Sequence, residues 1–313
     1  MKNSASIILS ITAAAALLFT ACVDEPIFES STGQGKITLI TTWANRTAGV
    51  AIPASYAVHI GKYATTVSGE KNTFDNLFQP ATYRTHIYNS AEKISVEGDI
   101  ATVATMVEPE PSQVSTNQWD QDPIRVESMP GWLFSAAEDF VVEGNKDYIF
   151  TVPMTQQVRE LKCVLKIAGG PAPINIASVH IMGVAQSINL DTNELGGFGA
   201  VDQLLERPNT DASSLTTTFH LLGFVPYQGR PIINKQSIAP SATASKVVQL
   251  QTMILFEDRI FEGVFASDNL YELLPKFNQD KHLPVTLEAT LTMPQLEGTQ
   301  PTLSAWKVVS TPK

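Results

Sequence analysis

Residues 161–167, "LKCVLKI", place an apolar side chain at every second position. Cys163 and the apolar residues two positions to either side share one face, whereas Lys162 and Lys166 lie on the other. A period of two is typical of a β-strand with one buried face. The pattern therefore predicts a strand here, with the Cys163 thiol as a core side chain and not a nucleophile, because nucleophilic thiols need exposed, electropositive surroundings.

The same alternation recurs along the chain and is rich in Val, Ile, Thr and aromatic residues. Further predicted strands lie in residues 35–43, 82–89, 147–154, 178–190, 216–226, 246–258, 283–293 and 303–310. Turn-forming Gly, Pro and Asn separate these segments, and no regular alternation of strand and long helix is present. Short alternating segments of this kind predict an all-β chain of antiparallel β-sandwiches.

Two short helices are expected between strands. Leu270, Leu273 and Phe277 fall at helical spacing within residues 267–280, where Ser267, Asp268 or Asn269 could cap the helix. Pro275 removes a backbone donor, so this helix should end or kink there. Residues 201–208 are expected to form one or two further turns.

The length of 313 residues fits two domains after a leader. A Pro-rich, acidic stretch at 108–131 predicts a long surface loop inside the first domain. A strand ending at Pro153 and a polar stretch after it place the boundary near residue 155. We expect an N-terminal sandwich at 36–155 and a C-terminal sandwich at 156–313.

The first 21 residues have the pattern of a signal peptide. Ile7 to Phe19 is an apolar run too short to span a bilayer, preceded by a single charge at Lys2. A buried helix of the folded domain is the alternative. The small pair before Cys22 resembles the lipobox of bacterial lipoproteins, with Phe19 in place of the usual Leu. This resemblance implies that Cys22 carries acyl chains such as palmitate, each buried methylene contributing about 0.8 kcal/mol to anchoring.

Acidic residues follow at once in the predicted tether, residues 22–35. Asp24, Glu25 and Glu29 resemble the surface-export signal of lipoproteins in the Bacteroides group, although an ordinary solvated tether would look similar. The predicted location is the outer membrane, lipid-anchored and exposed at the cell surface. If Cys22 is acylated, Cys163 has no partner and no internal disulfide forms.

Composition and motifs point away from nucleic acid and from catalysis. The formal net charge is −10, with no local Lys/Arg cluster, which argues against a nucleic-acid partner. The five histidines are scattered, and neither a "GxSxG" elbow nor a phosphate-binding loop occurs. Asp191 and Asn193 begin like a calcium loop, but Leu195 stands where an oxygen ligand is needed. We predict no catalytic residue, cofactor or metal; paired carboxylates that meet only in the fold stay open as a hydrolase alternative.

The order of these segments resembles the fimbrillin-type lipoproteins of the Bacteroides group, in particular the anchor and accessory subunits of minor fimbriae. The resemblance rests on the leader, a first strand ending in Trp43, "FDNLFQPATYRTHIYNS", "GWLFSAAEDFVVEGNKDYIFTVPM", "QQVRELKCVLKI", "HIMGVAQSINLDTNEL" and "TTTFHLLGF". It covers nearly the whole chain. It implies two tandem transthyretin-like sandwiches whose function is assembly.

In related subunits, trimming of an N-terminal strand opens a groove that a neighbour's strand fills. The candidate exchanged strands here are the first, with Ile37, Leu39 and Trp43, and the last, with Leu303, Trp306 and Val308. The alternative is that both simply complete their own sheets. Arg46, the first arginine, follows the first strand, so trypsin-like trimming there would delete that strand.

The leading functional hypothesis is therefore a non-enzymatic fimbrial anchor or accessory subunit, with other fimbrial subunits as partners and the outer membrane held through the lipid on Cys22. The alternative is a cell-surface glycan-binding lipoprotein. In that case Trp119 and Trp132, in or beside the long loop, would be the ligand-facing aromatic side chains. Trp43 and Trp306 are expected in the core.

Overall fold

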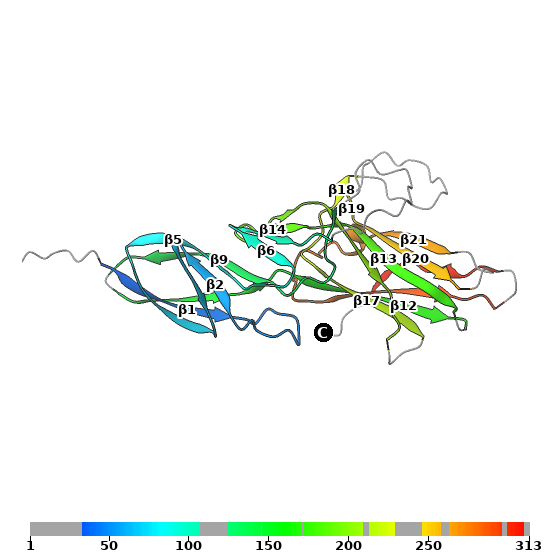
Figure 1. Cartoon of the computed structure of the whole chain (residues 1–313), viewed down its shortest axis with the longest axis horizontal. Coiled ribbons are helices and arrows are strands. Elements are labelled where there is room, and N and C mark those ends of the chain that lie inside the picture. The colour runs from blue at the N-terminus through cyan, green and yellow to red at the C-terminus, as the bar shows by residue number, and fades with distance from the viewer. Residues whose placement is uncertain are drawn as a thin grey trace, which may run out of the picture.

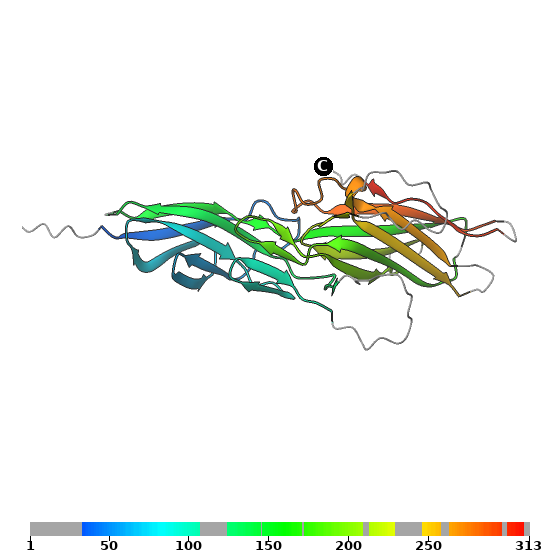
Figure 2. The same ribbon diagram turned by 90° about the horizontal axis from the view of Figure 1, so that it is seen from above.

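The computed structural model describes residues 33–106, 124–144, 146–170, 172–208, 213–228, 246–257, 263–295 and 299–309. These residues form two β-sandwiches that lie end to end, as two views at right angles show (Figures 1 and 2). The all-β prediction is confirmed. No helix in the described ranges is long and apolar enough to cross a membrane.

The first sandwich packs a three-stranded sheet against a five-stranded one. The smaller sheet has the order β10 (Tyr148–Pro153), β1 (Gly35–Thr42), β4 (Lys71–Phe78). The larger sheet has the order β11 (Thr155–Gln156), β9 (Phe134–Val142), β5 (Ala81–Tyr88), β2 (Tyr56–Ile60), β3 (Tyr63–Val67). Most pairs are antiparallel, but β1 and β10 run parallel.

Strand β1 forms where the sequence alternation predicts it. Ile37 and Leu39 are fully buried in the first core, whereas Lys36 points to solvent. Trp43 follows the strand with 4% of its surface exposed and meets Tyr56 and Phe134 edge to face. The predicted core position of Trp43 is confirmed.

The second sandwich repeats this plan with more residues. One sheet has the order β17 (Ser214–Leu221), β12 (Arg159–Ala168), β22 (Val285–Thr292), with β23 (Thr302–Leu303) and β24 (Lys307–Val309) both on the outer edge of β22. The other has the order β21 (Val264–Asn269), β20 (Gln249–Phe256), β13 (Ile174–Val184), β16 (Gly199–Leu204), β8 (Ile124–Arg125). The first strand, β12, again lies in the middle and runs parallel to β22. A separate pair joins β18 (Tyr227–Gln228) to β19 (Lys246–Val247).

Cys163 lies in the centre of this second core. Its side chain is fully buried and forms no disulfide. Burial raises the pKa of its thiol far above the usual value, because the thiolate would lose its hydration. The prediction of an inert core residue is confirmed.

A small sheet links the two sandwiches. A hairpin from the first half, β6 (Ile94–Glu97) and β7 (Ile100–Val103), pairs through β7 with β14 (Ser187–Asn189), which in turn pairs with β15 (Leu195–Gly196). Ala101 and Val103 of this hairpin belong to the second core. The domain ranges 36–155 and 156–313 stay a prediction, and packing crosses that division in this hairpin and in β8.

The helix prediction holds only for its first turn. Helix α2 (Leu270–Leu273) is capped by the Asn269 side chain, which accepts a hydrogen bond from the Tyr271 amide, and it ends before Pro275. The prediction of helical turns at 201–208 was wrong. Residues up to Leu204 lie in β16, because pairing with β13 overrides a local helical pattern.

Replacing Leu39 by Ala tests how strongly β1 holds the first core. Because Leu39 is fully buried, Leu39→Ala should lower the free energy of unfolding by about 2–5 kcal/mol. Urea unfolding followed by fluorescence measures this change. Lys36→Thr, on the exposed face of the same strand, is the control and should stay within about 0.5 kcal/mol. Equal effects of the two substitutions would contradict the assigned strand faces.

Candidate functional site

The first terminal strand occupies the middle of its sheet. Thr38 of β1 lies opposite Ile149 of β10 in a parallel ladder and opposite Thr73 of β4 in an antiparallel one. Without β1, both neighbours would lose their ladder partner and the core side chains Ile37 and Leu39 would be missing. Strand β1 is therefore a central element of the first sandwich and not a spare edge.

Hydrogen bonds hold the segment after β1 against the end of that strand. The guanidinium of Arg46 donates to the backbone oxygens of Trp43 and Val50, and the side chain is half-buried. The Trp43 indole Nε1 donates to Thr41 Oγ1 at 3.1 Å. Trimming after Arg46 stays a prediction, and it would require these contacts to open.

The C-terminal strands β23 and β24 lie at the edge of their sheet, along the outer side of β22. Strand β23 has two residues and pairs at Leu291–Thr292, and β24 has three and pairs at Thr286–Glu288. Leu303 is half-buried, and Val308 has 44% of its surface exposed. This edge is thus covered by two short, interrupted strands.

Trp306, between β23 and β24, is the main apolar contact of the C-terminal segment. It is buried with 3% exposure, and its Nε1 donates to Thr252 Oγ1 of β20 at 2.8 Å. The predicted core position of Trp306 is confirmed. The exchange of either terminal strand with a partner stays a prediction.

The remaining predicted site residues lie elsewhere. Cys22 and Trp119 fall outside the described residues. Trp132 is half-buried and packs against both hydrophobic cores, with its ring centroid 4.2 Å from that of His220. Trp132 therefore lies between the sandwiches, and a ligand-facing role for it stays a prediction.

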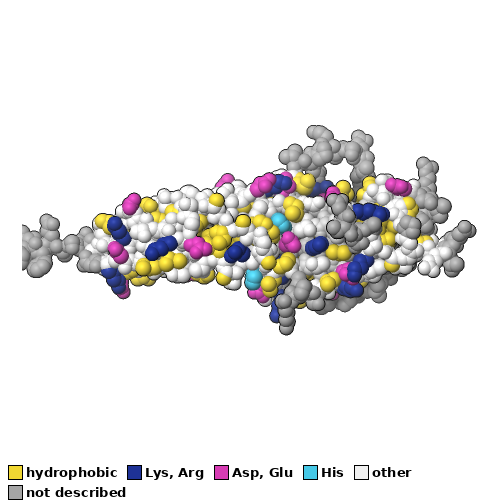
Figure 3. Space-filling model, turned by 90° about the horizontal axis from the view of Figure 1, so that it is seen from below, with side chains coloured by type: hydrophobic (Ala, Val, Ile, Leu, Met, Phe, Trp, Pro, Cys, Tyr) yellow, Lys and Arg dark blue, Asp and Glu magenta, His cyan; other side chains and the backbone are white. Residues whose placement is uncertain are grey.

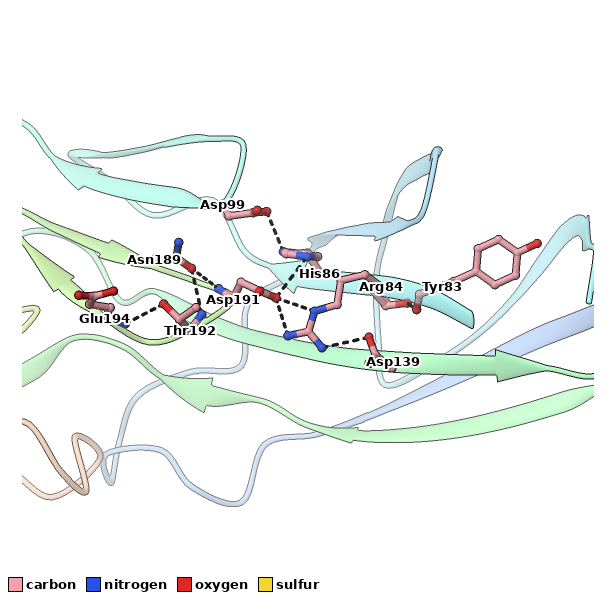
Figure 4. Close-up of polar contacts among 10 residues, drawn as sticks. Tyr83, Arg84, His86, Asp99, Asp139, Asn189, Asp191, Thr192 and Glu194 are labelled. Carbon is pink, nitrogen blue, oxygen red and sulfur yellow. Dashed lines mark hydrogen bonds and ion pairs between the residues drawn. The ribbon is translucent and has the colours of Figure 1, made fainter. Parts of the chain in front are cut away.

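Between the sandwiches, a charged cluster joins β5 to the β14–β15 turn (Figure 4). Arg84 Nε donates to Asp191 Oδ1 at 2.6 Å, and Arg84 Nη1 donates to Asp139 Oδ1 of β9 at 3.2 Å. His86 lies beside it, with Nδ1 2.9 Å from Asp99 Oδ1 and Nε2 3.6 Å from Asp191 Oδ1. The hydrogen bond to Asp191 is the main cause that raises the pKa of Arg84. Asp191, considered from the sequence as the start of a calcium loop, faces these two basic side chains.

Two consecutive glutamines form the polar centre of the junction. Gln156 is buried, and its Nε2 donates to Thr47 Oγ1 at 2.9 Å and to the Lys281 backbone oxygen at 3.0 Å. Gln157 is also buried, and its Nε2 donates to Asn193 Oδ1 at 3.0 Å. Buried amides paired in this way fix the surrounding loops, because breaking one bond leaves a buried polar group unsatisfied.

Arg159 fixes the loop at residues 276–283. Its guanidinium donates to the backbone oxygens of Phe277 at 2.6 Å, Gln279 at 2.9 Å and Leu283 at 2.8 Å, and it lies 5.0 Å from the centre of the Phe277 ring. Burial lowers the pKa of Arg159. The arginine thus acts as a structural anchor for a loop that has no regular secondary structure.

A cavity of about 280 Å³ opens beside this loop, with Asn45, Thr155, Gln157, Asn193, Lys281 and His282 among its lining residues. A second cavity of about 160 Å³ shares Thr155, Gln157 and Asn193 with it. In the described part of the chain, no group of three His, Cys, Asp or Glu side chains is placed to hold a metal ion. On the face shown in Figure 3, positive and negative side chains are interspersed along the molecule.

The fold and these features define a class of elongated protein built from two β-sandwiches. No protein-family model matches the chain, and no curated protein sequence matches it. Two solved structures of proposed adhesins from Bacteroides ovatus share the fold. The first has 12% sequence identity and a TM-score of 0.55, and the alignment covers 90% of this chain and 94% of that one. The second has 11% sequence identity and a TM-score of 0.51, and the alignment covers 88% of this chain and 96% of that one.

The fimbrial anchor protein Mfa2 from Porphyromonas gingivalis also aligns, with 8% identity, a TM-score of 0.46 and coverage of 88% of this chain and 97% of that one. The two structures with TM-scores of 0.55 and 0.51 are thus of proposed adhesins, and they have the two-sandwich fold that the sequence resemblance implies. At these identities the likeness is one of fold.

Sequence reasoning missed the junction residues. Gln156 and Gln157 belong to a polar segment at the predicted domain boundary, and nothing in that segment indicates that their side chains are buried. Arg84 lies on a predicted strand, and the alternation of that strand does not predict which residue pairs with it. The available signal was Asp191, which begins a turn that resembles a calcium loop but has Leu195 where an oxygen ligand is needed. Partners 107 residues apart, as for Arg84 and Asp191, leave no local pattern.

The pH dependence of stability tests the environment of Lys281. The pKa of Lys281 is lowered to about 8, first because burial disfavours the ammonium and then because Arg159 is near. In the unfolded chain the value is about 10.4, so between these two values the unfolded state binds more protons and native stability rises with pH. Below about pH 8 the cost of the buried charge is present in full.

Lys281→Met should therefore be more stable than the unmodified chain at neutral pH, and this advantage should shrink as the pH rises from about 8 to about 10.4. Urea unfolding at a series of pH values measures it. Lys276→Met, an exposed position on the same loop, is the matched control and should show no such trend. An advantage that stays constant with pH would show that Lys281 is not desolvated.

Proposed function

We propose that this chain is a lipid-anchored surface subunit of a fimbrium, an anchor or accessory component that works by assembly and not by catalysis. Its partners are other fimbrial subunits, and a partner strand adds to the outer edge of β22. The observation that carries the proposal is the weak cover of that edge by β23 and β24, of two and three residues.

The edge of β22 is better suited to exchange than the position of β1. Strand β1 is central, and Ile37 and Leu39 are fully buried. It also connects directly to the tether that would carry the lipid at Cys22, so cleavage of the chain after β1 would separate the sandwich from its anchor. By contrast, β24 lies at the sheet edge with Val308 exposed, and short edge strands are the ones most readily replaced.

An incoming strand would gain two kinds of contact on β22. Its backbone would complete the ladder along Val285–Thr292, and its alternate side chains would replace the buried Trp306 and the half-buried Leu303. In β-strand addition, main-chain hydrogen bonds supply affinity and the alternating side-chain sites supply register. The fold shared with proposed adhesins supports a role in adhesion or fimbrial assembly.

A reversible disulfide between β22 and β24, called the β22–β24 staple below, tests strand addition. Glu288 and Lys307 are opposite each other on β22 and β24, with 3.5 Å between Lys307 Nζ and Glu288 Oε1, so a Glu288→Cys/Lys307→Cys pair can form a disulfide across the two strands. We expect the oxidised variant to lose co-purification with fimbrial subunits and to regain it after reduction. Ala57→Cys/Thr66→Cys, on β2 and β3 of the first sandwich, is the matched staple and should leave assembly intact. Assembly that continues with β24 stapled would refute exchange at this edge.

Membrane fractionation tests the lipid anchor. Cys22→Ser removes the atom that would be acylated, so the protein should leave the outer-membrane fraction and lose surface labelling in intact cells. Cys163→Ala changes the buried cysteine and should leave both properties unchanged. Undiminished membrane retention of Cys22→Ser would remove the lipid anchor from the proposal.

A further inference from the structure

We propose that the cavity at the junction of the sandwiches binds a hexuronic acid unit of an acidic polysaccharide, with Lys281 contacting its carboxylate and polar side chains of both sandwiches contacting its hydroxyl groups. This inference goes beyond the fimbrial role and does not depend on it. The residues that carry it are Lys281, Asn45, Thr155 and His282, none of which belongs to the terminal strands.

The size and position of the cavity suit a single ring. Its volume of about 280 Å³ is just below the range of about 300–1,000 Å³ that is usual for drug-sized ligands, so it admits a smaller molecule. It lies where the β1–β2 segment, the β11 strand and the loop after α2 meet. Ligand sites are common at such interfaces between folded units.

Charge selects the ligand class. Lys281 Nζ has one acceptor, Gln157 Oε1 at 3.3 Å, and within the described ranges it makes no ion pair with a carboxylate. Arg159, also without an ion pair there, is near enough to disfavour the charged form of Lys281 further. Lys281 Nζ therefore contacts a neutral amide, whereas the charge of Asp280, which also lines the cavity, acts to raise the pKa of Arg159. A desolvated ammonium group without a carboxylate partner is costly, and an anionic ligand group at Lys281 would relieve this cost.

Geometry favours a carboxylate over a phosphate. The Arg159 guanidinium is engaged by the backbone oxygens of Phe277, Gln279 and Leu283, so Lys281 alone presents unused charged donors to the cavity. One ammonium group matches the single charge of a carboxylate.

The other walls present groups that suit hydroxyls. The side chains of Asn45, Thr155 and His282 form no hydrogen bond with any part of the chain that the structure describes, and each can donate to or accept from a sugar hydroxyl. The buried amides of Gln156 and Gln157 are already paired and hold these walls in place. A polar cavity with a prearranged frame and unused rim groups fits a polyhydroxylated ligand better than an apolar one.

Three small probes separate charge from ring recognition. The full chain, purified in detergent, is titrated with sodium D-glucuronate, with D-glucose, which lacks the carboxylate, and with sodium acetate, which lacks the ring. Titration calorimetry or ligand-observed NMR at pH 6.5 measures binding. We expect glucuronate to bind at least about tenfold more tightly than either other probe, the scale of one charge-assisted hydrogen bond.

Two variants and one control assign the contacts. Lys281→Met should weaken glucuronate binding about tenfold or more and leave glucose binding unchanged. Thr155→Val keeps the side-chain shape but removes the hydroxyl group. It should weaken the binding of glucuronate and leave the binding of acetate unchanged. Lys276→Met, exposed on the same loop, should bind glucuronate like the unmodified chain.

Several results would overturn the proposal. Glucuronate that does not bind, or that binds equally to Lys281→Met, would remove the site. Acetate binding as tightly as glucuronate would reduce it to a general carboxylate site, such as one for a peptide C-terminus, and would exclude the sugar. Because staple variants at β22 leave the cavity residues unchanged, loss of assembly and loss of sugar binding are separate results.

Discussion

The parallel pairing of a first strand with a late strand is the constraint on which both sandwiches depend. In the first, β1 pairs with β10, and in the second, β12 pairs with β22. Parallel neighbours cannot be joined by a tight hairpin, and most of the other strands of each sandwich lie in the long connection between them. The first strand consequently lies in the middle of its sheet, with β4 or β17 on its other side. Each core therefore depends on a pairing between strands that are far apart in the chain.

One-sided burial is what made the strands predictable. The alternation in residues 161–167 predicted β12, which spans Arg159–Ala168, because apolar side chains at every second position face one core. The sequence shows no comparable pattern for which strands pair with each other. The parallel pairs and the β6–β7 hairpin on β14 depend on which faces meet in space, and residues 201–208 show that pairing with β13 outweighs a helical pattern.

The candidate sites were predictable to different degrees. The terminal strands could be named from the sequence because Trp43 and Trp306 mark amphipathic segments near the chain ends, and both side chains are buried. What sequence could not supply was the difference between a central strand and an edge strand. The junction was less accessible still, because Gln156 and Thr47 are 109 residues apart and Lys281 and Gln157 are 124 apart.

The hairpin that reaches from the first half onto β14 has a mechanical consequence. The strands of both sandwiches run along the long axis of the molecule (Figure 1), and ladder hydrogen bonds lie across the strand direction. A tensile load applied between the two ends therefore shears these ladders, so that many bonds must rupture together. Ala101 and Val103 of the hairpin are buried in the core of the second sandwich. The same load therefore also has to pull these two side chains out of that core before the two halves can separate.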